Sequence, residues 1–290
     1  MSDDVLKPGI ETKEELPSLS PEDSFQLWER DDFCFPVGTE VSPVSTESRA
    51  VVHLEPSSPA ADRFRLAQIR MKGVQAARKL KTVLITSPLP GDGKTTISLN
   101  LATVLSENGK VPVLLLEADV YRPTLIKRLG LKPWPGLTEY FRRGEDPLLA
   151  IRRIDPLGFY LLPAGQPVGG GVSILQSPFA LQLILSLSSS SFRWILIDSP
   201  PTTPVADVLT LNGQVDASLL VAWAGKTPRE SIEESVRTLG PDHILGVILN
   251  GVEGLNRMYS KYYGYGKSYA REKPAKPSAL EGLGLNERAR

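Results

Sequence analysis

Residues 82–96 constrain the fold more than any other part of the chain, because they join a strand, a tight turn and the start of a helix. They read TVLITSPLPGDGKTT, a β-branched apolar run followed by a Pro/Gly turn and Gly-Lys-Thr-Thr, and ISLNLATVL follows at 97–105. This order is typical of a phosphate-binding loop, although Pro88 stands where the usual pattern has its first glycine. The alternative is an ordinary glycine-rich turn. We interpret the segment as a P-loop, which predicts a nucleotide-binding protein.

The residue types of this loop suit a triphosphate. Gly91 and Gly93 let the backbone N–H groups approach the phosphates closely. Lys94 supplies a positive charge to the β- and γ-phosphates, and the Thr95 hydroxyl is placed to ligate Mg²⁺ at the positive end of the following helix. The residues expected to hold ATP from this loop are Pro90, Gly91, Asp92, Gly93, Lys94, Thr95 and Thr96.

Composition favours a cytoplasmic globular protein. A hydrophobic fraction of 41% is enough for a core, and no apolar run approaches the roughly 20 residues that span a bilayer. Cys34 is the only cysteine, so no disulfide framework is expected. The net charge of zero conceals an asymmetry, since residues 1–50 carry 12 acidic against 4 basic side chains, and residues 254–290 carry 8 basic against 3 acidic. The two ends are either solvated tails or, for the basic one, a docking segment for an acidic or anionic surface.

The periodicity predicts an α/β fold of the P-loop NTPase (Rossmann-like) class. Strands that are apolar on both faces alternate with helices, which indicates a mostly parallel sheet covered by helices on both faces. The expected strands are 50–54, 82–86, 111–119, 158–165, 192–201, 217–223 and 243–251, and the expected helices are 60–80, 97–105, 179–187 and 227–239, with short helices over 123–150. Residues 1–48 are predicted to be an acidic, mostly disordered leader, 49–253 the P-loop domain and 254–290 a flexible, basic, tyrosine-rich tail.

Carboxylates follow two of these strands at their C-terminal ends, where parallel sheets bind ligands. The second core strand ends in Glu117 and Asp119, which alternation places on one side. They are expected to meet a nucleotide-bound Mg²⁺ or, alternatively, to form an acidic loop edge. WILI leads into Asp198, the position of a Walker B metal-binding aspartate. Asn250 ends the last strand, where its amide is expected either to contact adenine or to cap a turn.

Three segments together resemble the bacterial tyrosine kinases, the cytoplasmic P-loop autokinases of capsule and exopolysaccharide biosynthesis. They are SPLPGDGKTT, LLLEADVYRP and ILIDSPP. The resemblance covers about residues 50–252. Glu117-Ala-Asp119-Val-Tyr121 falls on the family's Asp-x-Asp-x-Arg motif, with Glu and Tyr in place of its first Asp and its Arg. The septum-positioning ATPases share the fold but carry a second lysine early in the P-loop, and Ser87-Pro88-Leu89-Pro90 has none.

The tail adds a fourth point of similarity. Five of the eight tyrosines lie in the 11 residues YSKYYGYGKSY at 259–269. Such a cluster resembles the autophosphorylation tail of this family, and the alternative is an aromatic, glycine-rich segment without enzymatic meaning. The resemblance implies that the phosphate acceptors are Tyr259, Tyr262, Tyr263, Tyr265 and Tyr269.

The family implies transfer of a phosphoryl group from ATP to tyrosine, in trans within a ring-shaped homo-oligomer. Lys94, Glu117, Asp119 and Asp198 are the implied catalytic residues, and Thr95, Asp119 and Asp198 the implied metal ligands. Glu117 or Asp119 would orient or deprotonate the phenol. The implied partners are a membrane polysaccharide co-polymerase that activates the kinase at the inner face of the plasma membrane and a cognate tyrosine phosphatase, with no nucleic acid. The alternatives are a nucleotide-gated scaffold of the same export system and a positioning-type P-loop ATPase.

Overall fold

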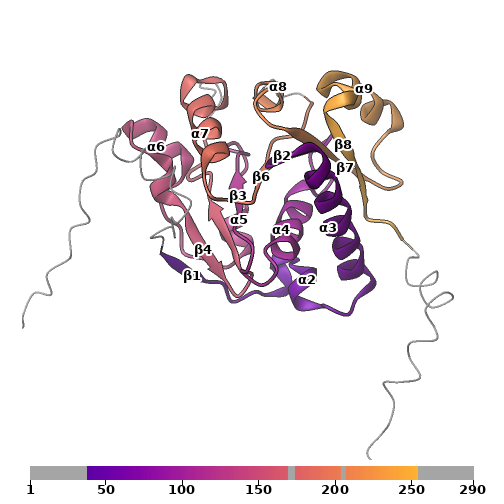
Figure 1. Cartoon of the computed structure of the whole chain (residues 1–290), viewed down its shortest axis with the longest axis horizontal. Helices are drawn as coiled ribbons and strands as arrows, with labels where there is room; N and C mark the ends of the chain where they lie inside the picture. The colour runs from indigo at the N-terminus through magenta and orange to yellow at the C-terminus, as the bar shows by residue number, and fades with distance from the viewer. Residues whose placement is uncertain (1–37, 169–173, 204–206, 254–290) are drawn as a thin grey trace, which may run out of the picture. The chain divides into compact units, whose positions relative to one another are not determined.

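Eight strands form a single sheet in the computed structural model, which describes residues 38–168, 174–203 and 207–253. The sheet order is β1-β4-β5-β3-β6-β2-β7-β8 (Figure 1). The strands are β1 Thr39–Val41, β2 Thr82–Thr86, β3 Val113–Glu117, β4 Arg152–Asp155, β5 Phe159–Leu162, β6 Trp194–Asp198, β7 Ala217–Trp223 and β8 Ile244–Asn250. Neighbours from β5 through β8 pair in parallel, whereas β4 runs antiparallel to β5. The predicted mostly parallel sheet is confirmed.

The central strands are buried on both faces, which explains their unbroken apolar sequences. In β3, Leu114 and Leu116 belong to one core cluster, while Val113 and Leu115 belong to the other. Helices therefore have to cover both sides of the sheet. Helices α2, α3, α4 and α5 pack on one side, and α6, α7, α8 and α9 pack on the other (Figure 1). Their bounds are α2 Val51–Leu54, α3 Pro59–Arg78, α4 Lys94–Leu105, α5 Leu125–Arg128, α6 Leu137–Arg143, α7 Pro178–Ser189, α8 Asp207–Asn212 and α9 Arg229–Leu239.

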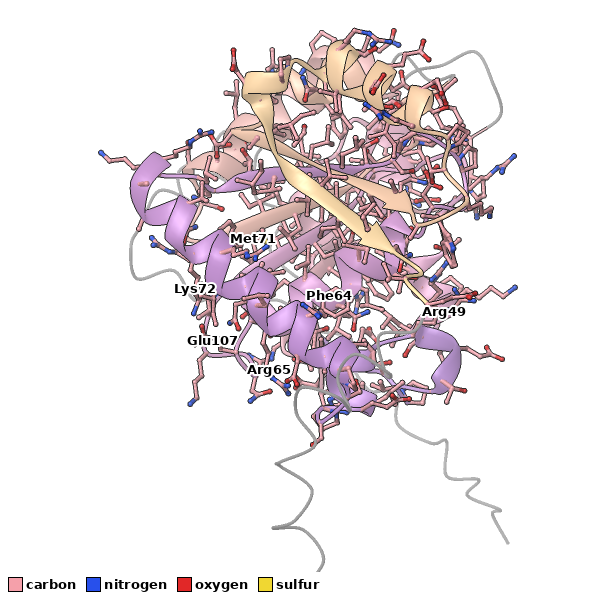
Figure 2. All side chains as sticks on the ribbon, turned by 90° about the vertical axis from the view of Figure 1, so that its right-hand side faces the viewer. Arg49, Phe64, Arg65, Met71, Lys72 and Glu107 are labelled. Atoms are coloured by element: carbon pink, nitrogen blue, oxygen red, sulfur yellow. The ribbon has the colours of Figure 1, made fainter. Side chains whose placement is uncertain are left out.

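Helix α3 covers α4 on the outside of the first layer. It is the 20-residue basic helix that the sequence predicts at 60–80. Met71 and Phe64 pack into the core cluster beneath α3, and Lys72 forms an ion pair with Glu107 after α4 (Figure 2). Arg65 pairs with Asp62 on its own helix, 2.7 Å apart.

Two predictions near the beginning of the domain are wrong. Within the expected strand 50–54, residues Val51–Leu54 form the single helical turn α2. Arg49 has a left-handed φ of 54°, and the Asn100 side chain of α4 binds both the Arg49 carbonyl and the Val52 N–H, so the chain is folded onto α4 and away from the sheet. The leader boundary at residue 48 is also too late, because residues 39–41 form β1, which pairs with β4. Residues 1–37 and the tail 254–290, with its five tyrosines, lie outside the described residues.

No helix within the described ranges combines the length and the apolar character that a membrane crossing requires.

Candidate active site

The loop between β2 and α4 has the backbone that the P-loop prediction requires. Gly91 and Gly93 have φ values of 88° and 93°, a region that L side chains rarely adopt. A Cβ added to Gly93 would lie 2.1 Å from Asn250 Nδ2. Lys94 is the first residue of α4, so the unpaired N–H groups of the first helical turn face the loop. This concave set of N–H groups fits a chain of phosphates.

Asp92 ties this loop to the strands at the edge of the sheet. Its carboxylate accepts hydrogen bonds from the Thr227 hydroxyl at 2.7 Å and from the Leu89 N–H at 3.0 Å. Its carbonyl accepts a third bond from Asn250 Nδ2 at 3.0 Å, while Asn250 Oδ1 accepts from the Gly251 N–H. Both ends of the Asn250 amide are thus engaged within the protein, as in the turn-capping alternative. Contact of Asn250 with adenine stays a prediction.

Two of the predicted carboxylates, Asp119 and Asp198, lie close to Lys94. Strands β3 and β6 are neighbours, and their register places Glu117 beside Asp198. Asp119 lies just beyond β3, with its Oδ2 3.6 Å from Lys94 Nζ. Its other oxygen, Oδ1, accepts from the Arg122 N–H at 3.1 Å, which fixes the turn that follows. The parallel sheet therefore brings together residues that are about 100 positions apart in the chain.

Asp198 is the strongest indication of a cation site. It is 1% exposed, and Ser98 donates to its Oδ1 at 3.0 Å. Its Oδ2 is buried without a hydrogen-bond partner among the described residues. Burial raises the pKa of Asp198 to about 6, against the opposing influence of Lys94, Thr95 and Ser98. A buried, unpaired carboxylate oxygen beside a phosphate loop fits a divalent cation or a water bound to one.

Glu117 has a different environment from Asp119. It is 1% exposed, and its Oε1 accepts from the N–H groups of Thr124 and Leu125 at 2.6 and 2.8 Å. Its Oε2 lies 3.3 Å from the Ala164 nitrogen, which donates to it. Burial raises the pKa of Glu117 to about 7, although these backbone bonds oppose the shift. The carboxylate thus fixes the turn into α5, so the geometry favours Asp119 over Glu117 for contact with a substrate.

Several residues of the site were not predicted from the sequence. Ser98 and Thr227 hold Asp198 and Asp92, but a serine inside a helix and a threonine before one carry no distinguishing pattern. Arg128 donates to the Thr96 hydroxyl at 3.0 Å, and burial, followed by the charge of Arg49, lowers its pKa. These contacts arise only when distant segments meet.

Tyr121 stands at the position of the motif's arginine and contacts α8. Its hydroxyl forms a hydrogen bond with Asp207, the first residue of α8. Gln176 Nε2 donates to the other carboxylate oxygen of Asp207 at 2.7 Å. The Tyr121 side chain thus links the turn after β3 to the helical layer that contains α8.

Comparison with known proteins agrees with this site. No family model matches the chain. The chain is 28% identical over 220 residues to the tyrosine-protein kinase YwqD of Bacillus subtilis (strain 168), which covers 75% of this chain and 92% of YwqD. It is 29% identical over 249 residues to the succinoglycan biosynthesis transport protein ExoP of Rhizobium meliloti (strain 1021), covering 77% of this chain but only 30% of ExoP.

A solved structure agrees in both sequence and fold. The VpsO kinase domain superposes with a TM-score of 0.58 at 30% identity, over 66% of this chain and 95% of that domain. The match therefore includes nearly the whole of a kinase domain. With the P-loop, the two acidic strand ends and these relatives in place, the chain belongs to the bacterial tyrosine kinase family.

Proposed function

We propose that this protein is an ATP-dependent protein-tyrosine autokinase that phosphorylates the tyrosines of its own C-terminal tail in trans. Family membership supports the kinase activity. The acceptors would be Tyr259, Tyr262, Tyr263, Tyr265 and Tyr269. The name of ExoP, a succinoglycan biosynthesis transport protein, supports a role in polysaccharide assembly or export. In this proposal a membrane co-polymerase activates the kinase at the inner face of the membrane.

The observation that carries this proposal is the unpaired Asp198 Oδ2 beside Lys94. Removing a carboxylate from water costs several kcal/mol unless a cation or a hydrogen-bond donor compensates. Lys94 acts on Asp198 electrostatically but forms its ion pair with Asp119, so Asp198 retains an open acceptor. Thr95 and Asp198 would hold Mg²⁺, with Asp119 on the same side. The bound Mg²⁺ would neutralise charge on the phosphate oxygens.

The chain's own residues would bind and orient both substrates. The N–H groups of Gly91 to Thr95 surround the phosphates of ATP, and Lys94 stabilises the charge that develops on the transferred group. The phenolic oxygen forms a bond to the γ-phosphorus as the bond to the bridging oxygen of ADP breaks. Asp119 orients the phenol and accepts its proton, so the products are ADP, phosphotyrosine and one proton. Glu117 keeps Asp119 in position through the backbone of the turn that both residues share.

Tandem mass spectrometry of the full-length protein, incubated with Mg²⁺ and ATP, tests this proposal. Lys94→Met is the inactive comparison, and Lys110→Met, which removes an exposed lysine beyond α4, is the matched control. We expect phosphate on residues 259–269 in the wild type and in Lys110→Met, and none in Lys94→Met.

Two results would contradict it. Phosphate on the tail of Lys94→Met would show that another enzyme supplies it. Absence of phosphate from the tails of all three proteins, with ATP bound and the co-polymerase present, would favour the nucleotide-gated scaffold.

A further inference from the structure

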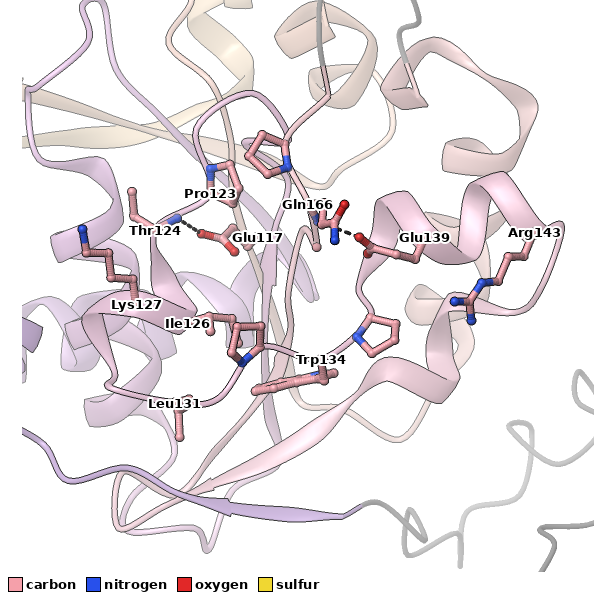
Figure 3. A pocket seen from close by; sticks show the side chains of 14 residues that line it. Glu117, Pro123, Thr124, Ile126, Lys127, Leu131, Trp134, Glu139, Arg143 and Gln166 are labelled. Carbon is pink, nitrogen blue, oxygen red and sulfur yellow. Dashed lines mark hydrogen bonds between the residues drawn. The ribbon is translucent and has the colours of Figure 1, made fainter.

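A pocket of about 730 Å³ opens between the turn into α5 and helix α6, and the roles proposed above give it no function. Glu117 and Thr124 form one wall, and Trp134 lies across the pocket from them (Figure 3). Lys127 and Arg143 lie at opposite ends in this view. We call this pocket the Trp134 groove.

Apolar side chains form half of the lining of the Trp134 groove. The indole of Trp134 is held in place, since its Nε1 donates to the Ala150 carbonyl at 2.9 Å. Prolines restrict the backbone around it, so little entropy is lost when a ligand binds. A pocket of this size can bury about two or three large side chains of a peptide. The apolar lining residues are Ile126, Leu131, Trp134, Pro123, Pro133, Pro135 and Pro167.

The charged residues around the Trp134 groove are mostly basic. Residues 122–143, which supply most of its lining, carry six basic side chains and one acidic side chain. Lys127 is part of the lining, and Lys132 lies between two lining residues. Within the described ranges neither lysine forms an ion pair, and Arg143 approaches Glu145 only to 3.8 Å. The groove is therefore suited to an apolar ligand that also carries negative charge.

The leader contains one segment with this combination. Residues 25–35 read FQLWERDDFCF, which includes three phenylalanines, one tryptophan, one leucine and three acidic side chains. Residues 1–37 together carry 10 acidic against 3 basic side chains, opposite in sign to residues 122–143. The tyrosine-rich segment 259–269 carries two lysines and no acidic side chain, so charge disfavours it in this groove.

The leader also enters the domain beside the groove. Gly38 is the first described residue, and its carbonyl accepts from the Arg153 N–H at 3.0 Å. The neighbouring Arg152 guanidinium lies 5.3 Å from the centroid of the Trp134 ring. Phe35 precedes Gly38 by 3 residues and Trp28 precedes it by 10. An extended chain covers about 3.3–3.6 Å per residue, so these rings can reach positions about 10 and 35 Å from Gly38.

We propose that residues 25–35 dock in the Trp134 groove of their own chain. Their aromatic side chains pack against Trp134 and the prolines, and their carboxylates face Lys127 and Arg143. The docked segment covers the turn into α5. This inference goes beyond the proposed function, because it holds whether or not the chain transfers phosphate.

Photo-crosslinking in the full-length protein tests the docking. The photoreactive residue p-benzoylphenylalanine replaces Lys132 beside the groove, or Lys110, an exposed lysine beyond α4, as the control position. Unlabelled and ¹⁵N-labelled copies are mixed before irradiation, and mass spectrometry identifies the joined peptides. We expect links from position 132 to residues 25–35 of the same copy, and none from position 110. Links to residues 259–269, links between copies, or no link at all from position 132 would overturn the proposal.

Peptide binding tests the same contact without a photoreactive residue. A fluorescein-labelled peptide of residues 23–37 is titrated with the full-length protein and followed by anisotropy. Replacing Trp28, Phe33 and Phe35 of the protein by serine should free the groove. Binding should then tighten by about fivefold, as expected when the leader occupies the groove in about four molecules of five.

Substitutions in the groove of this freed protein locate the peptide. Lys127→Met should weaken its binding by about twofold to fivefold, the range of an exposed ion pair. Pro135→Ser, at an exposed position that spares the contacts of Trp134, should weaken it as well, whereas Lys110→Met should not. Equal binding by the wild-type and freed proteins, or no effect from either groove substitution, would refute the docking. Neither assay requires phosphate transfer, so failure of the kinase proposal would leave both results interpretable.

Discussion

Replacing Asp92 by alanine should destabilise the phosphate loop, because its carboxylate bonds both to the loop itself and to the segment before α9. Asp92 is 2% exposed, and it accepts from the Leu89 N–H before it and from the Thr227 hydroxyl across the site. A hydrogen bond to a charged group contributes about 1.5–3 kcal/mol to stability. Leu89 and Thr227 are partly exposed, so water replaces part of each lost bond. We therefore expect Asp92→Ala to lower the free energy of unfolding by about 2–3 kcal/mol, near the lower end for two such bonds.

Urea unfolding of the full-length protein measures this change. Thr227→Val keeps the side chain's shape but removes both the bond to Asp92 and the bond that the Trp223 N–H donates to the Thr227 hydroxyl at 2.7 Å, so its loss should exceed half of that of Asp92→Ala. Asp242→Ala, at an exposed position in the turn before β8, controls for loss of an aspartate. The double variant should lose less than the sum of the two single variants, because both remove the same bond. A loss below about 0.5 kcal/mol for Asp92→Ala, the range of ordinary surface substitutions, would refute the claim that the Asp92 carboxylate stabilises the loop.

Three further predictions follow from the site and its surroundings. Gly93→Ala should abolish binding of a fluorescent ATP analogue, because the new methyl group would lie 2.1 Å from Asn250 Nδ2; unchanged affinity would contradict the geometry. Asp198→Asn should keep the fold, by circular dichroism, but lower tail phosphorylation by about 100-fold or more, since the carboxylate proposed to hold Mg²⁺ is lost. Burial raises the pKa of Asp146 above its ordinary value of 3.8, although the hydrogen bond from the Leu148 N–H opposes the shift. Between the two pKa values the native state binds more protons than the unfolded state, so the stability of the wild type falls as pH rises through this window. Asp146→Asn does not titrate, so its unfolding free energy relative to wild type should rise across that window in pH-stepped urea titrations, and a flat difference would contradict the shift.

The core of the fold could be predicted because its signals are local. Strand β3 is a run of Val and Leu buried on both faces, and no other element accommodates that pattern so well. The order of P-loop, acidic strand end and Asp198 then places the site at the C-terminal edge of the sheet. There Lys94 pairs with Asp119 and acts on the charge of Asp198.

Other parts depend on contacts that a linear pattern does not contain. Strand β4 reads RRID and β1 reads TEV, both too short and too polar to resemble core strands, yet they pair with each other. Glu117 looks like a second catalytic acid by its spacing from Asp119. Its engagement with the backbone at Thr124, Leu125 and Ala164 becomes visible only once the turn and β5 are in place.

The pairing of β1 with β4 has a practical consequence for shortened versions of the protein. Glu40 bonds Arg152 at 2.8 Å, and the Ser42 hydroxyl donates to the Leu129 carbonyl at 2.7 Å, so this segment fastens the sheet edge to the end of α5. A chain trimmed at residue 49 would leave β4 with an open edge that invites association between molecules. Crystallisation and activity work on a trimmed chain should therefore keep residues 38–48. Loss of solubility on their removal would reflect the open edge of β4 and not a missing regulatory signal.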